Sequence, residues 1–128
     1  SFPTRRSSDL NEEFFCQQIM ILDPEMRSAR VINNRGHLVA GGMKKGMTSL
    51  EDEKQDEMMF MEIALRVRMR HEFDKEFGPV SFSLSYRGKV IIYSFPLADD
   101  NVLLVSSSRD ADFGQIPFKI MKIIGKTP

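Results

Sequence analysis

The 128-residue sequence has no tryptophan, a single cysteine, two histidines and no excess of either charge. One cysteine excludes an internal disulfide, and its apolar neighbours indicate that Cys16 is a buried, reduced thiol. Zinc needs about four ligands, so a metal centre is not expected. Eighteen basic and eighteen acidic residues give no sign of a surface for nucleic acid or for a basic contact with a membrane.

The sequence also lacks a long hydrophobic run and an arranged set of catalytic groups. No apolar stretch approaches the ~18 residues of a membrane span, so we expect a cytoplasmic protein with no membrane contact. No nucleophile, base and orienting group can be assembled from its two histidines and one cysteine. We therefore expect a non-enzymatic protein that needs no cofactor.

The two ends of the chain are not expected to belong to its folded domain. Residues 1–10, SFPTRRSSDL, have no apolar segment of the kind found in signal peptides, and they resemble the translation of a sequencing adaptor. We expect residues 1–10 to be a non-native segment. A single domain is expected over residues 11–125, followed by a short tail over residues 126–128.

Apolar periodicity and turn residues predict eight elements in the order α-β-β-α-β-β-β-α. The expected helices cover residues 11–22, about 48–77, and from 110 or 112 to 125, and the expected strands cover 27–32, 37–41, 80–86, 90–95 and 102–105. The strands at 90–95 and 102–105 are apolar on both faces and therefore central, whereas those at 37–41 and 80–86 are better edges. The expected fold is α/β (α+β): a five-stranded antiparallel sheet in a three-layer sandwich.

Several segments resemble the roadblock/LC7 domain of the profilin-like group. Residues 29–41 give a strand, a polar turn that ends in Gly36, and a second strand, and residues 102–105 precede an acidic helix start. The stretch at 22–27 and the layout after it also resemble a small archaeal family. Roadblock likeness implies a homodimer or heterodimer that acts as a scaffold or as a regulator of a small GTPase. In such dimers the central helices pack together and the third strands pair. By this resemblance, the expected dimer interface includes Ser81, Ser83 and Ser85.

The central helix is apolar on two sides. Thr48 and Glu51 fit a capping box at its start, and Gly78-Pro79 ends it. At 100° per residue, one stripe runs along the whole helix and is expected to lie on the sheet: Met58, Met61, Leu65, Met69 and Phe73. The opposite stripe occupies the first half only, and we expect a second subunit to cover it: Met59, Phe60, Ile63, Ala64 and Val67. A helix sunk deeper into its own core, or a misassigned stripe, is the alternative.

The loop before the central helix nearly matches a phosphate-binding sequence. Residues 41–48 follow the G-x-x-x-x-G-K-[ST] spacing, but Met47 occupies the lysine position, which favours a plain glycine-rich connector. A weaker hypothesis is that an anion binds at the helix N-terminus, held by Lys44, Lys45 and Gly46. The polar stretch 106–112 is interpreted as a cap and turn, with a small polar pocket as the alternative.

Two functions therefore remain open. The first is a dimeric protein-interaction module of roadblock type, with a small GTPase or another signalling protein as its partner. The second is a small-molecule sensor of the PAS or GAF kind, with a ligand between the sheet and the central helix. The second ranks lower because PAS-like chains place their helices and strands in a different order.

Overall fold

The structure, a computed structural model, describes residues 7–125, with side chains from residue 11 onward. Residues 1–6 and 126–128 lie outside the described part, so the expectations for both ends of the chain stay predictions. The elements are α1 (Ser7–Met20), β1 (Met26–Ile32), β2 (Leu38–Met43), α2 (Glu53–Arg70), a 3₁₀ turn η1 (His71–Phe73), α3 (Asp74–Phe77), β3 (Ser83–Tyr86), β4 (Ile91–Pro96), a second 3₁₀ turn η2 (Ala98–Asp100), β5 (Val102–Ser107) and α4 (Ile116–Ile123). The predicted order of helices and strands is confirmed.

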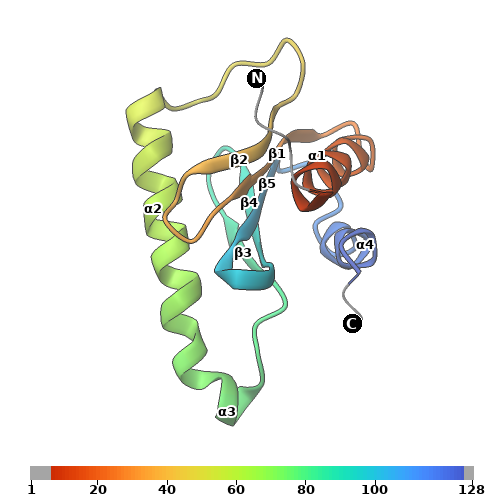
Figure 1. Cartoon of the computed structure of the whole chain (residues 1–128). Helices are drawn as coiled ribbons and strands as arrows, with labels where there is room; N and C mark the ends of the chain where they lie inside the picture. Colours follow the sequence, from red (N-terminus) through yellow and green to blue (C-terminus); the bar gives the residue numbers. More distant parts are fainter. Residues whose placement is uncertain (1–6, 126–128) are drawn as a thin grey trace.

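The five strands form one antiparallel sheet in the order β2-β1-β5-β4-β3. Figure 1 shows α2 on one face of this sheet and α1 with α4 on the other, which gives the predicted three layers. The strands that are apolar on both faces, β4 and β5, lie inside the sheet, and β2 and β3 form its edges. This placement follows from burial, because only an inner strand covered on both sides can hide two apolar faces.

The two faces of the sheet carry cores of different size. Beneath α1 and α4 lies the larger core, which includes Ile19, Tyr93, Phe95 and Ile120, all fully buried. Beneath α2 lies a smaller one, formed by Ile32, Phe60, Val67, Val102 and Leu104, with Met59, Ile63 and Ile92 packed against it. The smaller core can cover only part of a long helix.

The start of α2 corrects the prediction. The helix begins at Glu53, and its N-cap is Asp52 instead of Thr48. The backbone N–H of Gln55 donates to Asp52 Oδ1 at 2.8 Å, and the Asp52 N–H donates to Gln55 Oε1 at 3.1 Å. Asp is a stronger N-cap residue than Thr, and the Glu51 of the expected box is instead bound to the Ser49 hydroxyl. The single helix expected over residues 48–77 is also interrupted near its end, because α2 stops at Arg70 and η1 follows.

Two other boundaries also differ from the sequence interpretation. α4 begins at Ile116 and has Pro117 in its first turn, where a proline is tolerated. The preceding residues from Ser108 form successive turns instead of the first turn of the helix. β3 begins at Ser83, because residues 80–82 do not pair with β4. Phe82 packs there against Phe95 and Phe118.

Candidate functional site on the outward face of α2

The two apolar stripes of α2 are those predicted, but each faces the opposite way. Phe60, Ala64 and Val67 are 1–6% exposed and pack on the sheet of their own chain, with Met59 and Ile63 half-buried beside them. They are therefore covered by the same subunit and not by a partner, which corrects the predicted interface. The stripe expected on the sheet is 49–64% exposed, and it consists of Met58, Met61, Leu65, Met69 and Phe73. We call these five residues the outward stripe.

A buried ion pair explains which side of α2 faces the sheet. Arg30 projects from β1 toward the helix, and its Nη1 lies 3.6 Å from Oδ2 of Asp56 in the first helical turn. Its guanidinium also lies 4.9 Å from the centre of the Phe60 ring. An arginine in a dry layer needs a carboxylate and an aromatic face within reach. Both are on the side of α2 that carries Ala64.

The turn between β1 and β2 comes close to the backbone of α2. A Cβ on Gly36 would lie 2.8 Å from both Cα and N of Met61, and Gly36 has φ +80°. Only glycine combines this left-handed conformation with so close an approach. The turn packs against the flank of α2 and leaves the outward stripe exposed.

A groove of about 800 Å³ lies between α2 and the β3–β4 hairpin, beside the outward stripe. Its apolar lining comes from both sides and includes Met58, Met59, Ile63, Val90 and Ile92. Its rim carries Arg87 and Lys89 of the hairpin turn and the Glu62–Arg66 pair, whose closest N···O distance is 2.6 Å. The groove continues the apolar surface of the stripe toward the edge strand β3.

The three serines expected at a dimer interface lie in or just before β3, the last strand of the sheet. Ser83 accepts a hydrogen bond from Arg70 Nη1 at 2.7 Å, and Ser85 lines the groove. Ser81 is exposed and precedes the paired part of the strand. No strand of the described chain pairs with the outer side of β3, so its backbone groups there can pair with another chain.

The structure does not bring the predicted anion-binding residues to a helix N-terminus. α2 begins beyond Gly46, its first turn is capped by Asp52, and that turn carries Glu53 and Asp56. Lys44 donates through Nζ to the carbonyl of Pro24, at a distance of 3.0 Å. A capped and acidic helix start disfavours an anion, so the anion hypothesis gains no support from this geometry.

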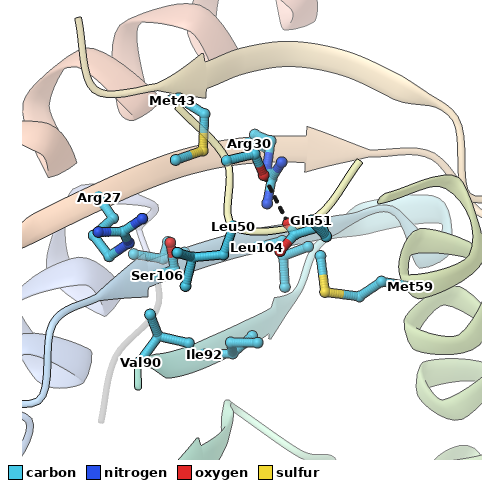
Figure 2. A pocket seen from close by; sticks show the side chains of 12 residues that line it. Arg27, Arg30, Met43, Leu50, Glu51, Met59, Val90, Ile92, Leu104 and Ser106 are labelled. Atoms are coloured by element: carbon cyan, nitrogen blue, oxygen red, sulfur yellow. Dashed lines mark hydrogen bonds between the residues drawn. The ribbon is translucent and has the colours of Figure 1, made fainter. Parts of the chain in front are cut away.

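A small pocket of about 40 Å³ lies where the segment before α2 crosses the sheet (Figure 2). Arg27 and Arg30 enter it from β1, Ser106 from β5, and Leu50 and Glu51 from the crossing segment. Hydrogen bonding to Asp56 lowers the pKa of Glu51, and burial raises the pKa of Asp56 to about 6. Sequence reasoning missed this cluster, although an arginine within an apolar strand signalled the need for a nearby acid.

A second polar cluster holds the far end of α2. His71 Nδ1 is 2.7 Å from Asp74 Oδ2, and its Nε2 is 2.7 Å from Asp100 Oδ1 in η2. Hydrogen bonds to Asp74 and to Asp100 raise the pKa of His71. In residues 7–125, no group of three or more His, Cys, Asp or Glu side chains could hold a metal ion. None of the helices in that same range is long and apolar enough to cross a bilayer.

Comparison with solved structures identifies the fold as of roadblock/LC7 type. MglB of Myxococcus xanthus superposes with a TM-score of 0.72 at 14% identity, over 97% of this chain and 90% of that one. The roadblock/LC7 domain from Streptomyces avermitilis gives 0.66 at 12% identity, over 88% and 91%. An MglB with a tetrameric arrangement gives 0.69 at 10% identity, over 98% and 96%. These likenesses, with the confirmed element order, do not favour the PAS or GAF alternative.

Comparison by sequence gives a narrower result. No curated protein matches the chain. A family match covers residues 9–128, nearly the whole sequence. The chain therefore belongs to the family of unknown function DUF6659.

Proposed function

We propose that this chain is a non-enzymatic, dimeric protein-interaction module in which a second copy covers the outward stripe of α2. The observation that carries the proposal is the stripe itself: five large apolar side chains, each about half exposed or more, four of them along one line of α2 and the fifth, Phe73, in the adjoining η1. Contiguous apolar surface of this kind marks an interaction site more often than it stays in water. The interface face is thus opposite to the one that the sequence pattern suggested.

Burial of the outward stripe alone would not supply enough free energy to hold two subunits together. Full burial of a large apolar side chain is worth about 1.5–3 kcal/mol, so these half-exposed side chains would return on the order of 1 kcal/mol each. Ten such side chains in two subunits would supply roughly 10 kcal/mol, similar to the ~4–15 kcal/mol lost on association. Adjoining surface is therefore needed, and the groove and the unpaired edge of β3 provide it. Pairing of the two β3 strands through Ser83 and Ser85 would extend the sheet across the dimer.

We further propose that the dimer serves as a scaffold or regulator and that its partner is a small GTPase or another signalling protein. The roadblock/LC7 fold supports this, since likeness to that family implies such partners. An MglB with the same fold, in a tetrameric arrangement, supports an assembly of more than one copy. Capture from a host extract on the immobilised chain, with and without added GTP, would test the partner. Recovery that does not respond to the nucleotide would contradict the GTPase.

Size-exclusion chromatography with light scattering tests the dimer. The wild-type chain should elute with twice the monomer mass at micromolar concentration, and Leu65→Glu, at the centre of the stripe, should elute as a folded monomer. Ile21→Glu is the matched control, because Ile21 is also an exposed apolar residue but lies beyond α1, away from α2. A wild-type monomer, or a dimer that Leu65→Glu leaves intact, would refute the proposed interface.

A further inference from the structure

His71 joins the far end of α2 to the turn between β4 and β5. Its Nδ1 lies 2.7 Å from Oδ2 of Asp74, and its Nε2 lies 2.7 Å from Oδ1 of Asp100. A neutral imidazole has one N–H and one lone pair, whereas an ionised carboxylate can only accept. Both contacts are hydrogen bonds to ionised carboxylates only when both ring nitrogens carry a proton. Because aspartate is a stronger acid than imidazolium, the geometry describes a protonated His71 that bridges two carboxylates.

The other groups around His71 do not displace this proton. The pocket beside it, of about 240 Å³, receives apolar side chains from the segment before β3 and from the end of β4: Pro79, Val80, Pro96 and Leu97. α2 contributes Arg70, whose Nη1 donates to the Ser83 hydroxyl at 2.7 Å. Two carboxylates in contact with the ring outweigh one arginine that is bound elsewhere. Hydrogen bonds to Asp74 and to Asp100 therefore raise the pKa of His71.

The segment after α2 depends on polar contacts of this kind, because it buries nothing. η1 and α3 together contain no buried residue, and Figure 1 shows α3 beyond the end of the sheet. A segment without buried apolar side chains has low local stability. The hydrogen bond from His71 to Asp100 connects residues 29 apart in the sequence, so it ties residues 71–77 to the sheet.

The turn that receives His71 has a strained backbone. Asp99 and Asp100 are both left-handed, with φ of 58° and 59°. Hairpin turns of this shape favour Asn-Gly, because glycine adopts a positive φ without strain. Strained backbone persists where its surroundings hold it, and this turn is held by His71 and by Asn34, whose Nδ2 donates to the Asp99 carbonyl at 3.1 Å. The carboxylate of Asp100, and not its backbone preference, explains an aspartate at this position.

Loss of the proton would leave His71 with one donor for two carboxylates. The unprotonated nitrogen would then direct its lone pair at a carboxylate oxygen 2.7 Å away, so one contact must break. Asp74 lies three residues along the chain, whereas Asp100 lies 29 residues away. Because a short loop closes at a smaller entropy cost than a long one, the contact with Asp100 is the one that breaks.

We propose that His71 is a proton-operated clamp: its protonated form holds residues 71–77 against the β4–β5 turn, and its neutral form releases them. Phe73, the last residue of the outward stripe, lies in that segment, so release would take it out of line with Met69. The clamp goes beyond the proposed dimer and does not rest on it, because every group in it belongs to one chain. Since the pKa of His71 is raised, the clamp is closed below the ordinary 6.5 and opens as pH rises through the higher folded value.

Imidazole NMR and hydrogen exchange on the intact chain test the clamp. His71 should titrate with a midpoint above 6.5, and both of its ring nitrogens should carry protons at pH 6. The sequence has one other histidine, His37, so His37→Gln assigns the signals. Between pH 6 and pH 9, exchange in residues 71–78, corrected for its intrinsic rate, should rise several-fold.

Two glycine substitutions in the turn form a matched pair. Asp100→Gly removes the carboxylate that His71 contacts and also relieves the left-handed strain, so the turn stays formed while exchange in residues 71–78 is fast at both pH values. Asp99→Gly relieves the same strain at the neighbouring position but keeps the carboxylate, so it should behave like wild type.

The clamp is refuted by any of three results: a wild-type His71 midpoint at or below 6.5, equal exchange of residues 71–78 at both pH values, or equal behaviour of the two glycine variants. Repeating the exchange in monomeric Leu65→Glu separates the two proposals, because the clamp should work there unchanged. Failure of the dimer would leave these measurements as they are.

Discussion

Replacement of Gly36 by alanine tests how closely the β1–β2 turn touches α2. The added Cβ would lie 2.8 Å from Cα and N of Met61 and 3.0 Å from the carbonyl carbon of Phe60. All three are backbone atoms of a helix whose buried side chains hold it on the sheet, so none can move aside alone. The turn must shift away from α2, or α2 must lift from the smaller core.

The expected loss of stability has two parts, and substitutions at two other glycines measure these parts separately. An L-residue in the left-handed region costs roughly 1–2 kcal/mol, and forced overpacking adds about 1–3 kcal/mol. Gly36→Ala should therefore lose about 2–5 kcal/mol of the free energy of unfolding. Gly46 has the same φ of +80° but no atom within 4 Å of its Cβ position, so Gly46→Ala should lose only the first part. Gly42→Ala, with neither constraint, should change stability little.

Urea denaturation followed by far-UV circular dichroism, at one protein concentration, gives the three free energies by linear extrapolation. The decisive quantity is the difference between Gly36→Ala and Gly46→Ala. Equal losses for these two variants would show that the turn does not press on α2. The orientation of α2, and with it the outward stripe, would then be wrong.

Three further outcomes follow from buried and paired groups. Phe60→Ala should cost about 3–5 kcal/mol, whereas Phe77→Ala, 84% exposed, should stay within about 0.5 kcal/mol; similar losses in urea denaturation would contradict the assignment of the buried stripe. Burial raises the pKa of the Cys16 thiol to about 12, so it should not react with a disulfide reagent at pH 8 until the chain unfolds, and rapid reaction of the folded chain would contradict its burial. His71 binds its proton more tightly when folded, so its contribution to stability is complete below the ordinary pKa of 6.5 and is lost as pH rises through the higher folded value. His71→Gln should remove that part of the pH dependence in urea denaturation, and an unchanged profile would contradict it.

The fold could be predicted because its strongest signals are local and redundant. β4 and β5 are apolar on both faces, which by itself places them inside the sheet. Ser83 and Ser85 alternate with apolar residues and mark an edge strand, and the turn that ends at Gly36 joins a hairpin. The start of α2 is harder to predict, because the sequence offers two neighbouring capping boxes, Thr48-x-x-Glu51 and Asp52-x-x-Gln55. Only packing decides which of them begins the helix.

The lengths of the two apolar stripes on α2 do not decide which stripe packs on the sheet. The sequence pattern places the longer stripe, from Met58 to Phe73, on the sheet, because that stripe runs along the whole expected helix. However, the sheet offers this side only a short apolar patch, chiefly Ile32, Ile92, Val102 and Leu104, and α2 extends past the sheet (Figure 1). A short patch matches the short stripe, so the surplus apolar surface is the longer one.

The buried ion pair gives the physical reason for the observed orientation of α2. Asp56 and Phe60 are four residues apart and therefore share a helix face, and both contact Arg30 of β1. That face must point to the sheet, since a buried arginine without a carboxylate is strongly unfavourable. Arg30 thus fixes the rotation of α2 about its own axis. The same interaction that satisfies one buried charge in the core determines which apolar side chains the helix presents to another molecule.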